Sequence, residues 1–159
     1  MLRTRCDLAL LLGALSALGC DGKPGAAAPT SEPTQGECQG DYDDFEPGMS
    51  KLAEPAGVAI ELLVAEPSPP VVRDDNTWTL KLNDAEGAPL LGAELLVSPY
   101  MPKHQHGSAE VLVRELGEGE YRLSRIELIM PGVWEIPISV TPLDGESSET
   151  EFRLCIAEQ

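Results

Sequence analysis

From Gly57 onward, the chain is a succession of short apolar or alternating segments separated by turn residues, and this spacing is its strongest constraint. Apolar residues that recur at every second position indicate strands with one buried face, and clusters of Gly, Pro, Asn and Asp indicate the turns between them. We expect seven strands, at residues 58–64, 77–82, 93–97, 110–115, 121–128, 133–140 and 151–156. The spacing predicts an all-β fold, an immunoglobulin-like antiparallel β-sandwich. We expect its core to include Trp78, Tyr121, Ile126 and Trp134.

The charge balance excludes one class of partner. Asp and Glu number 27 against 11 Lys and Arg, and the formal net charge is −16. A surface this acidic repels phosphate backbones, so we predict no nucleic-acid binding. The sequence also carries no G-x-S-x-G elbow, phosphate loop or H-E-x-x-H motif. We therefore predict that the protein is not an enzyme.

The amino terminus has the pattern of an export signal. Arg3 and Arg5 precede an apolar run at residues 8–18, which as a helix would rise about 16 Å, roughly half the thickness of a bilayer core. The run ends in Gly19-Cys20, which resembles the lipobox of bacterial lipoprotein precursors. The resemblance implies a signal peptide at residues 1–19, a lipid on Cys20 and attachment to a membrane of the bacterial cell envelope. The alternative is an ordinary cleaved signal that leaves Cys20 as a free thiol.

The remaining chain divides by composition. Residues 20–37 are rich in Pro, Gly, Ala, Thr and Glu and are expected to form a flexible tether, residues 38–56 are transitional, and residues 57–159 carry the sandwich. In an oxidising compartment, Cys38 and Cys155 are most simply explained as one disulfide. A thiolate metal site is the competing interpretation, although no C-x-x-C spacing supports it.

Both histidines of the chain lie close together, in the segment 100–107. If this segment is extended, His104 and His106 point the same way, since residues two apart in a strand share a face. Met101 and Met130 add thioethers. Imidazole and thioether are soft ligands that favour copper, especially Cu(I), over calcium or magnesium. The alternative is an exposed loop whose histidines bind nothing, because H-x-H alone is a weak motif.

Several short segments also occur in an order that resembles the YtkA-like domain, which is related to FixH-type proteins. They are residues 76–78, 87–93, 101–106, 117–121 and 130–134. The resemblance extends over about residues 57 to 157. It implies an exported immunoglobulin-like sandwich found near copper-handling and cytochrome-oxidase assembly systems. Carried over by position, it makes Met101, His104, His106 and Met130 the metal candidates.

Two functions follow from these observations. The first is a lipid-anchored, exported module that binds copper through the Met/His loop and exchanges it with a copper donor or acceptor protein. The second is a structural or protein-interaction module of the cell envelope that binds no ion and acts through its loops or strand edges. Loss of copper binding on replacement of both histidines would distinguish the first from the second.

Overall fold

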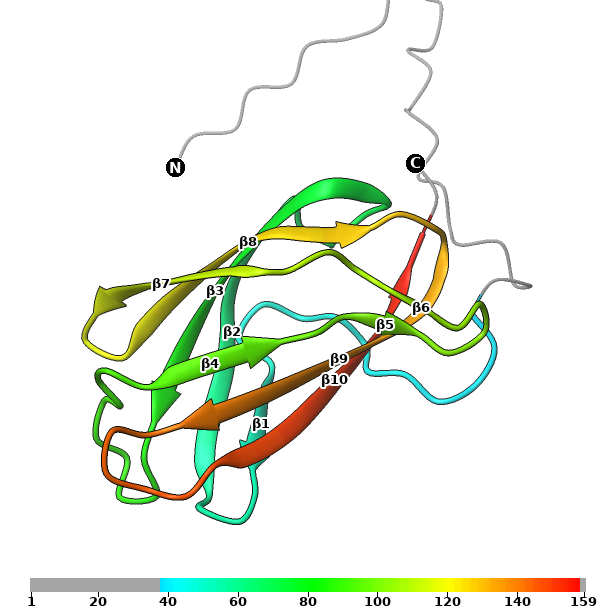
Figure 1. Ribbon diagram of the computed structural model, residues 1–159. Helices are drawn as coiled ribbons and strands as arrows, with labels where there is room; N and C mark the ends of the chain where they lie inside the picture. Colours follow the sequence, from blue (N-terminus) through cyan, green and yellow to red (C-terminus); the bar gives the residue numbers. More distant parts are fainter. Residues whose placement is uncertain (1–37, 158–159) are drawn as a thin grey trace, which may run out of the picture.

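The computed structural model describes residues 38–157, which fold into ten strands in two antiparallel sheets packed face to face (Figure 1). The first sheet has the order β1-β2-β3-β8-β7. The second has the order β10-β9-β5-β6, and β4 also pairs with β9. The bounds are β1 (Ser50–Ala53), β2 (Val58–Glu66), β3 (Arg73–Asn83), β4 (Glu94–Val97), β5 (Tyr100–Met101), β6 (His106–Gly107), β7 (Leu112–Gly117), β8 (Glu120–Leu128), β9 (Gly132–Thr141) and β10 (Ser148–Ile156).

The predicted sandwich is confirmed, with ten strands in place of seven. Each of the seven expected segments forms a strand, and β1, β5 and β6 are additional. β1 lies in the segment 38–56, which composition alone marks as transitional, and β5 and β6 form a short hairpin inside the histidine segment. The expected signal peptide at residues 1–19, the tether at 20–37 and Cys20 lie outside the described residues. Within residues 38–157, no helix is long and apolar enough to cross a membrane.

The core lies between the two sheets and is built by alternation. In β9, buried and partly exposed residues alternate along almost the whole strand, as the period-two pattern predicts. Trp78 from β3 and Trp134 from β9 are both fully buried, so each sheet contributes one indole. Tyr121 and Ile126 of β8 are buried as well, which confirms all four core predictions.

One long side of the sandwich is closed by backbone pairing. Glu54, directly after β1, and Glu149 of β10 exchange two backbone hydrogen bonds, of 3.0 and 2.8 Å, so the two sheets are joined there. Further along β10, the N–H of Asp43 donates to the carbonyl of Arg153, and the N–H of Arg153 donates to the Asp43 carboxylate. The outer edge of β10 is thus covered at both of its ends. We call this side the sealed side.

The expected disulfide is present and belongs to the sealed side. Cys38 is bonded to Cys155 of β10 across 117 positions of sequence, with a Cα–Cα distance of 5.6 Å. It fixes the first described residue to the last strand. Lys51 of β1 adds an ion pair of 2.6 Å with Asp43. The segment that precedes β1 is therefore attached to the sandwich along its length.

Candidate functional site

Two of the four predicted ligands are in direct contact at one end of the sandwich. His106 lies on β6, and Met130 lies in the chain crossing from β8 to β9, which passes from one sheet to the other. The imidazole Nε2 of His106 is 3.3 Å from the sulfur of Met130. Both side chains are half-buried. A soft nitrogen donor and a soft sulfur donor therefore face each other at the edge of the core.

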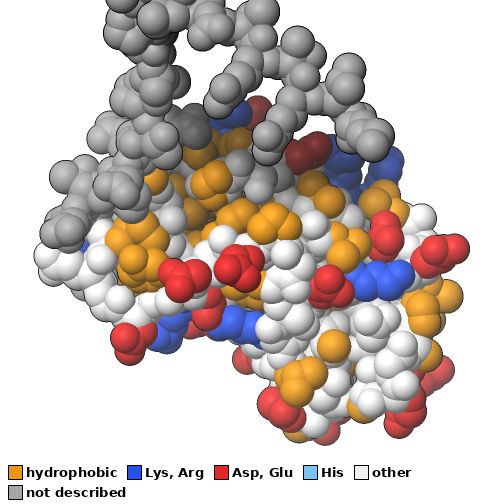
Figure 2. All heavy atoms as spheres, turned by 180° about the vertical axis from the view of Figure 1, so that it is seen from behind, with side chains coloured by type: hydrophobic (Ala, Val, Ile, Leu, Met, Phe, Trp, Pro, Cys, Tyr) orange, Lys and Arg blue, Asp and Glu red, His pale blue; other side chains and the backbone are white. Residues whose placement is uncertain are grey.

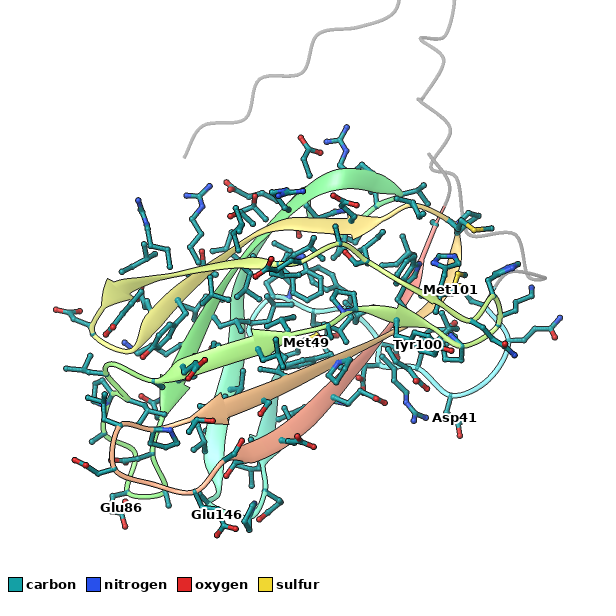
Figure 3. The ribbon with its side chains drawn as sticks, in the orientation of Figure 1. Asp41, Met49, Glu86, Tyr100, Met101 and Glu146 are labelled. Carbon is teal, nitrogen blue, oxygen red and sulfur yellow. A yellow bond between two sulfur atoms is a disulfide. The ribbon has the colours of Figure 1, made fainter. Side chains whose placement is uncertain are left out.

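The β5–β6 hairpin determines how His106 is presented. Met101 lies opposite His106 in this hairpin, and Tyr100 lies opposite Glu135 of β9. Residues directly opposite each other in an antiparallel pair point to the same face, so Met101 and His106 share the inward face of the sheet. Met101 is fully buried, whereas His106 lies nearer the surface. Figure 3 shows Tyr100 and Met101 at this end of the ribbon.

Trp134 positions Met130, the second residue of the contact. Its indole Nε1 donates a 2.9 Å hydrogen bond to the backbone carbonyl of Met130. The His106 ring meets the same indole edge-on, with centroids 5.5 Å apart and planes at 71°. Gly132, at φ 132°, lies between Met130 and Trp134 in a backbone conformation that other residues rarely adopt. The sequence identified Trp134 only as a core residue, and its contact with both candidate ligands was not foreseen.

The predicted geometry of the histidine pair is wrong. Residues 102–105 form a turn between β5 and β6, in which the N–H groups of His104 and Gln105 donate to the carbonyl of Met101 at 3.2 and 2.9 Å. Gln105 has a φ of 55°. The alternation of an extended segment therefore does not place His104 and His106 on one face. Their ring centroids lie 6.2 Å apart, and His104 is exposed.

The donors present favour a soft ion over a hard one. Among residues 38–157, no group of three His, Cys, Asp or Glu side chains is arranged to hold a metal ion. The site therefore consists of imidazole and thioether, which suit copper better than calcium or magnesium. The two donor atoms are in direct contact, so one ion could bind both only after the side chains move apart.

The two ring nitrogens of His106 have different surroundings. The Nδ1 atom of His106 is buried and has no hydrogen-bond partner among the described residues. A neutral imidazole carries one N–H and one lone pair, and only a lone pair binds metal. Nε2 faces the sulfur of Met130, and it carries the lone pair in the tautomer that has its proton on Nδ1.

Arg153 is the charged side chain near the hairpin that is paired with carboxylates. A hollow of about 380 Å³ beside the turn is lined in part by Lys103, Asp41, Glu135 and Arg153. Arg153 contacts the carboxylates of Glu151 at 2.6 Å and Glu135 at 3.4 Å. The hydrogen bond that Arg153 donates to the Glu151 carboxylate, followed by the charges of Glu151 and Glu135, raises the pKa of Arg153 above its ordinary value. Arg153 is therefore paired with two carboxylates, whereas Lys103 makes no ion pair with the residues that the structure describes.

Comparison with known proteins identifies the family. The family model described as YtkA-like matches residues 53–139. The chain belongs to the YtkA-like family. The match begins at the last residue of β1 and ends inside β9, so it includes the β5–β6 hairpin, Met130 and Trp134. No curated protein and no solved structure is similar enough to count as a relative. In this YtkA-like protein the described sandwich continues through β10, beyond the matched residues.

Proposed function

We propose that this YtkA-like protein is an exported, lipid-anchored β-sandwich that binds one copper ion, as Cu(I), between His106 and Met130. The observation that carries the proposal is the 3.3 Å contact between the imidazole Nε2 and the thioether sulfur. His104, from the exposed turn, and Met101, opposite His106, are the remaining candidate ligands. Thioether sulfur binds Cu(I) far better than it binds hard cations.

The position of the contact suits capture and delivery better than storage. His106 and Met130 are half-buried, and His104 is exposed on the adjoining turn, so a second protein can reach the ion. The net charge of −16 raises the local concentration of cations. Attachment of Cys20 to a membrane would keep the domain next to membrane-bound copper donors or acceptors.

Competitive titration with a chromogenic Cu(I) chelator tests the copper site. The chain from residue 21 to 159 retains every described residue and is used as the reference protein. We expect one Cu(I) per chain, with quenching of Trp134 fluorescence because its indole contacts His106. Met130→Leu keeps the side-chain volume but removes the sulfur. It should weaken Cu(I) binding by about tenfold or more, since even changes to residues that only support metal ligands cost roughly 10- to 100-fold.

Met49→Leu is the matched control, because Met49 is also partly buried against the core but lies before β1, away from the hairpin. This variant should bind Cu(I) as the unchanged protein does. His106→Phe should abolish binding and keep the melting temperature close to that of the reference protein. Equal affinity for Cu(I) in the Met130→Leu, Met49→Leu and reference proteins would refute the site. Absence of Cu(I) binding would leave the protein-interaction function as the conclusion.

The membrane anchor is tested separately. Cys20→Ser removes the thiol on which the lipid would be attached. The variant should move from the membrane fraction to the soluble fraction of cells, with the folded domain unchanged. An unaltered distribution would show that Cys20 does not anchor the protein.

A further inference from the structure

The long side of the sandwich opposite the sealed side is open. Within the described part of the chain, β4 pairs only with β9 and β7 pairs only with β8, so each strand has one edge without a partner. Figure 1 shows β4 and β7 on this side of the sandwich. A groove of about 840 Å³ is lined by residues 94–100 on one side and by residues 107–113, which include the first two residues of β7, on the other. We call it the β4–β7 groove.

The register shows which backbone groups of β4 face the groove. The N–H of Ser98 donates to the carbonyl of Pro137 on β9, at 3.3 Å. In an antiparallel pair, residues alternate between those whose N–H and C=O point toward the partner and those whose groups point away. Since Ser98 points toward β9, so does Leu96, and the groups of Leu95 and Val97 point to the groove. β4 therefore presents two N–H groups and two carbonyls to an added strand.

The side chains of the groove combine apolar surface with negative charge. Leu96 is 65% exposed and Leu112 is 48% exposed, although each lies on an edge strand. Exposed apolar side chains on unpaired edges are an aggregation hazard, which proteins normally suppress with charge or cover with another chain. Glu94 and Glu110 also line the groove, and no Lys or Arg does. The complementary ligand is therefore apolar and basic.

Two other occupants fit less well. A second copy of this chain would place the acidic edges of two molecules of charge −16 against each other. The segment at residues 20–37 of the same chain contains one lysine and no large apolar residue, so it cannot fill the apolar part of the groove.

Figure 2 shows the face of the molecule opposite to the view of Figure 1, where acidic, basic and apolar side chains are interspersed.

We infer that the β4–β7 groove binds an extended segment of a partner protein by strand addition, and that this segment alternates apolar residues with Lys or Arg. In this mode, main-chain hydrogen bonds to an open edge supply affinity and alternate side chains supply specificity. Glu94 and Leu96 share the outer face of β4, whereas Leu95 and Val97 face inward. The basic side chains of the segment therefore lie on the outer face, where they pair with Glu94 and cover Leu96 with their aliphatic stems, and its apolar side chains face inward beside Leu95 and Val97. Glu110 adds a second carboxylate from the opposite wall. The inference is independent of copper, because none of the four candidate copper ligands lines the groove.

A synthetic peptide of alternating valine and lysine, about eight residues long to span a strand of ordinary length, tests the inference. The reference protein, residues 21–159, is labelled with ¹⁵N, and the peptide is added stepwise while the amide signals are recorded. Saturable binding should shift the backbone amides of β4 and β7. N-methylation of every second peptide residue removes the donors on one edge and should abolish this binding. A peptide with glutamate in place of lysine should not bind.

Two double variants with reversed charges distinguish binding of the peptide in the groove from non-specific attraction of a basic peptide to an acidic protein. Glu94→Lys with Glu110→Lys should weaken peptide binding by about tenfold or more, because two adjacent attractions become repulsions. Glu86→Lys with Glu146→Lys changes the net charge equally at exposed turns outside the groove (Figure 3) and should have little effect. Equal weakening in both double variants, or equal binding of the N-methylated peptide, would overturn the inference. Absence of binding to the reference protein would overturn it as well.

Discussion

The two long sides of the sandwich are held together by different means. On the sealed side, Glu54 and Glu149 join the sheets through backbone hydrogen bonds, and the Cys38–Cys155 disulfide adds a covalent link. On the open side, the ties are made by side chains. The carboxylate of Glu115 on β7 accepts from the N–H of Gly92, before β4, at 3.2 Å. The hydroxyl of Tyr121 on β8 donates to the carbonyl of Leu90 and accepts from the N–H of Ala93, both at 3.0 Å. The edge nearest the first described residue is thus covered, and the far edge is left accessible.

Removal of the disulfide should produce the largest effect, since it acts on the sealed side. Cys38→Ser with Cys155→Ser opens a loop of 117 positions. The chain-entropy model gives a loss of about 4–5 kcal/mol in the free energy of unfolding for a loop of this length. Chemical denaturation of the double variant measures the loss. A loss below about 1 kcal/mol would show that the Asp43 and Glu54 contacts alone keep the edge of β10 covered.

Loss of the Tyr121 hydroxyl should have a smaller effect, on the open side. Tyr121→Phe leaves the ring in the core but removes a partner from both Leu90 and Ala93. Unpaired groups of this kind typically cost about 1–3 kcal/mol each, and less where water can reach them. Hydrogen exchange should accelerate at β4 and its preceding loop and stay unchanged at β10. Faster exchange at β10 as well would contradict the view that the sealed side and the open side are held together independently.

The same hydroxyl predicts a small pH effect. Burial raises the pKa of Tyr121 above its ordinary value of 10.0, the charge of Glu115 raises it further, and the hydrogen bond from Ala93 lowers it. A raised pKa in the folded state stabilises the fold fully below the unfolded pKa, and this contribution is lost as the pH rises through the folded pKa. Stability should therefore fall above about pH 10. Tyr121→Phe should lack this part of the fall in denaturation curves measured across that range.

The strands were predictable because their signal is local. Segments such as 77–82 and 121–128 alternate at period two and end at turn residues, and both form strands. β1 and the β5–β6 hairpin were missed for two reasons. β1 has only four residues, and β5 and β6 have two residues each, too few to show a period. Coverage of β10 by Asp43 depends on contacts across more than 100 residues, which composition cannot indicate.

The sequence named His106 and Met130 as candidates, but it did not indicate the contact between them. Soft donors in one segment pointed to His106 and Met101, and Met130 was added as a thioether in a different segment. The assumption of an extended chain placed His104 beside His106 on one face, whereas a turn separates them. Contact between His106 and Met130 arises because the β8–β9 crossing passes over the hairpin, which is a property of the tertiary fold. The hydrogen bond from Trp134 to the Met130 carbonyl also depends on the tertiary fold, so the sequence pattern did not indicate it.

The position of the disulfide has a mechanical consequence. Cys38 and Cys155 enclose the ten strands up to the end of β10 in a covalent ring. Tension applied through the chain before Cys38 and the chain after Cys155 passes through the sulfur–sulfur bond, and the enclosed strands carry little of it. Peeling of β1 from β2 by a pull on the amino-terminal segment is prevented in the same way. A pull on the two ends of the chain is therefore borne by the covalent ring, and the strands inside it keep their pairing.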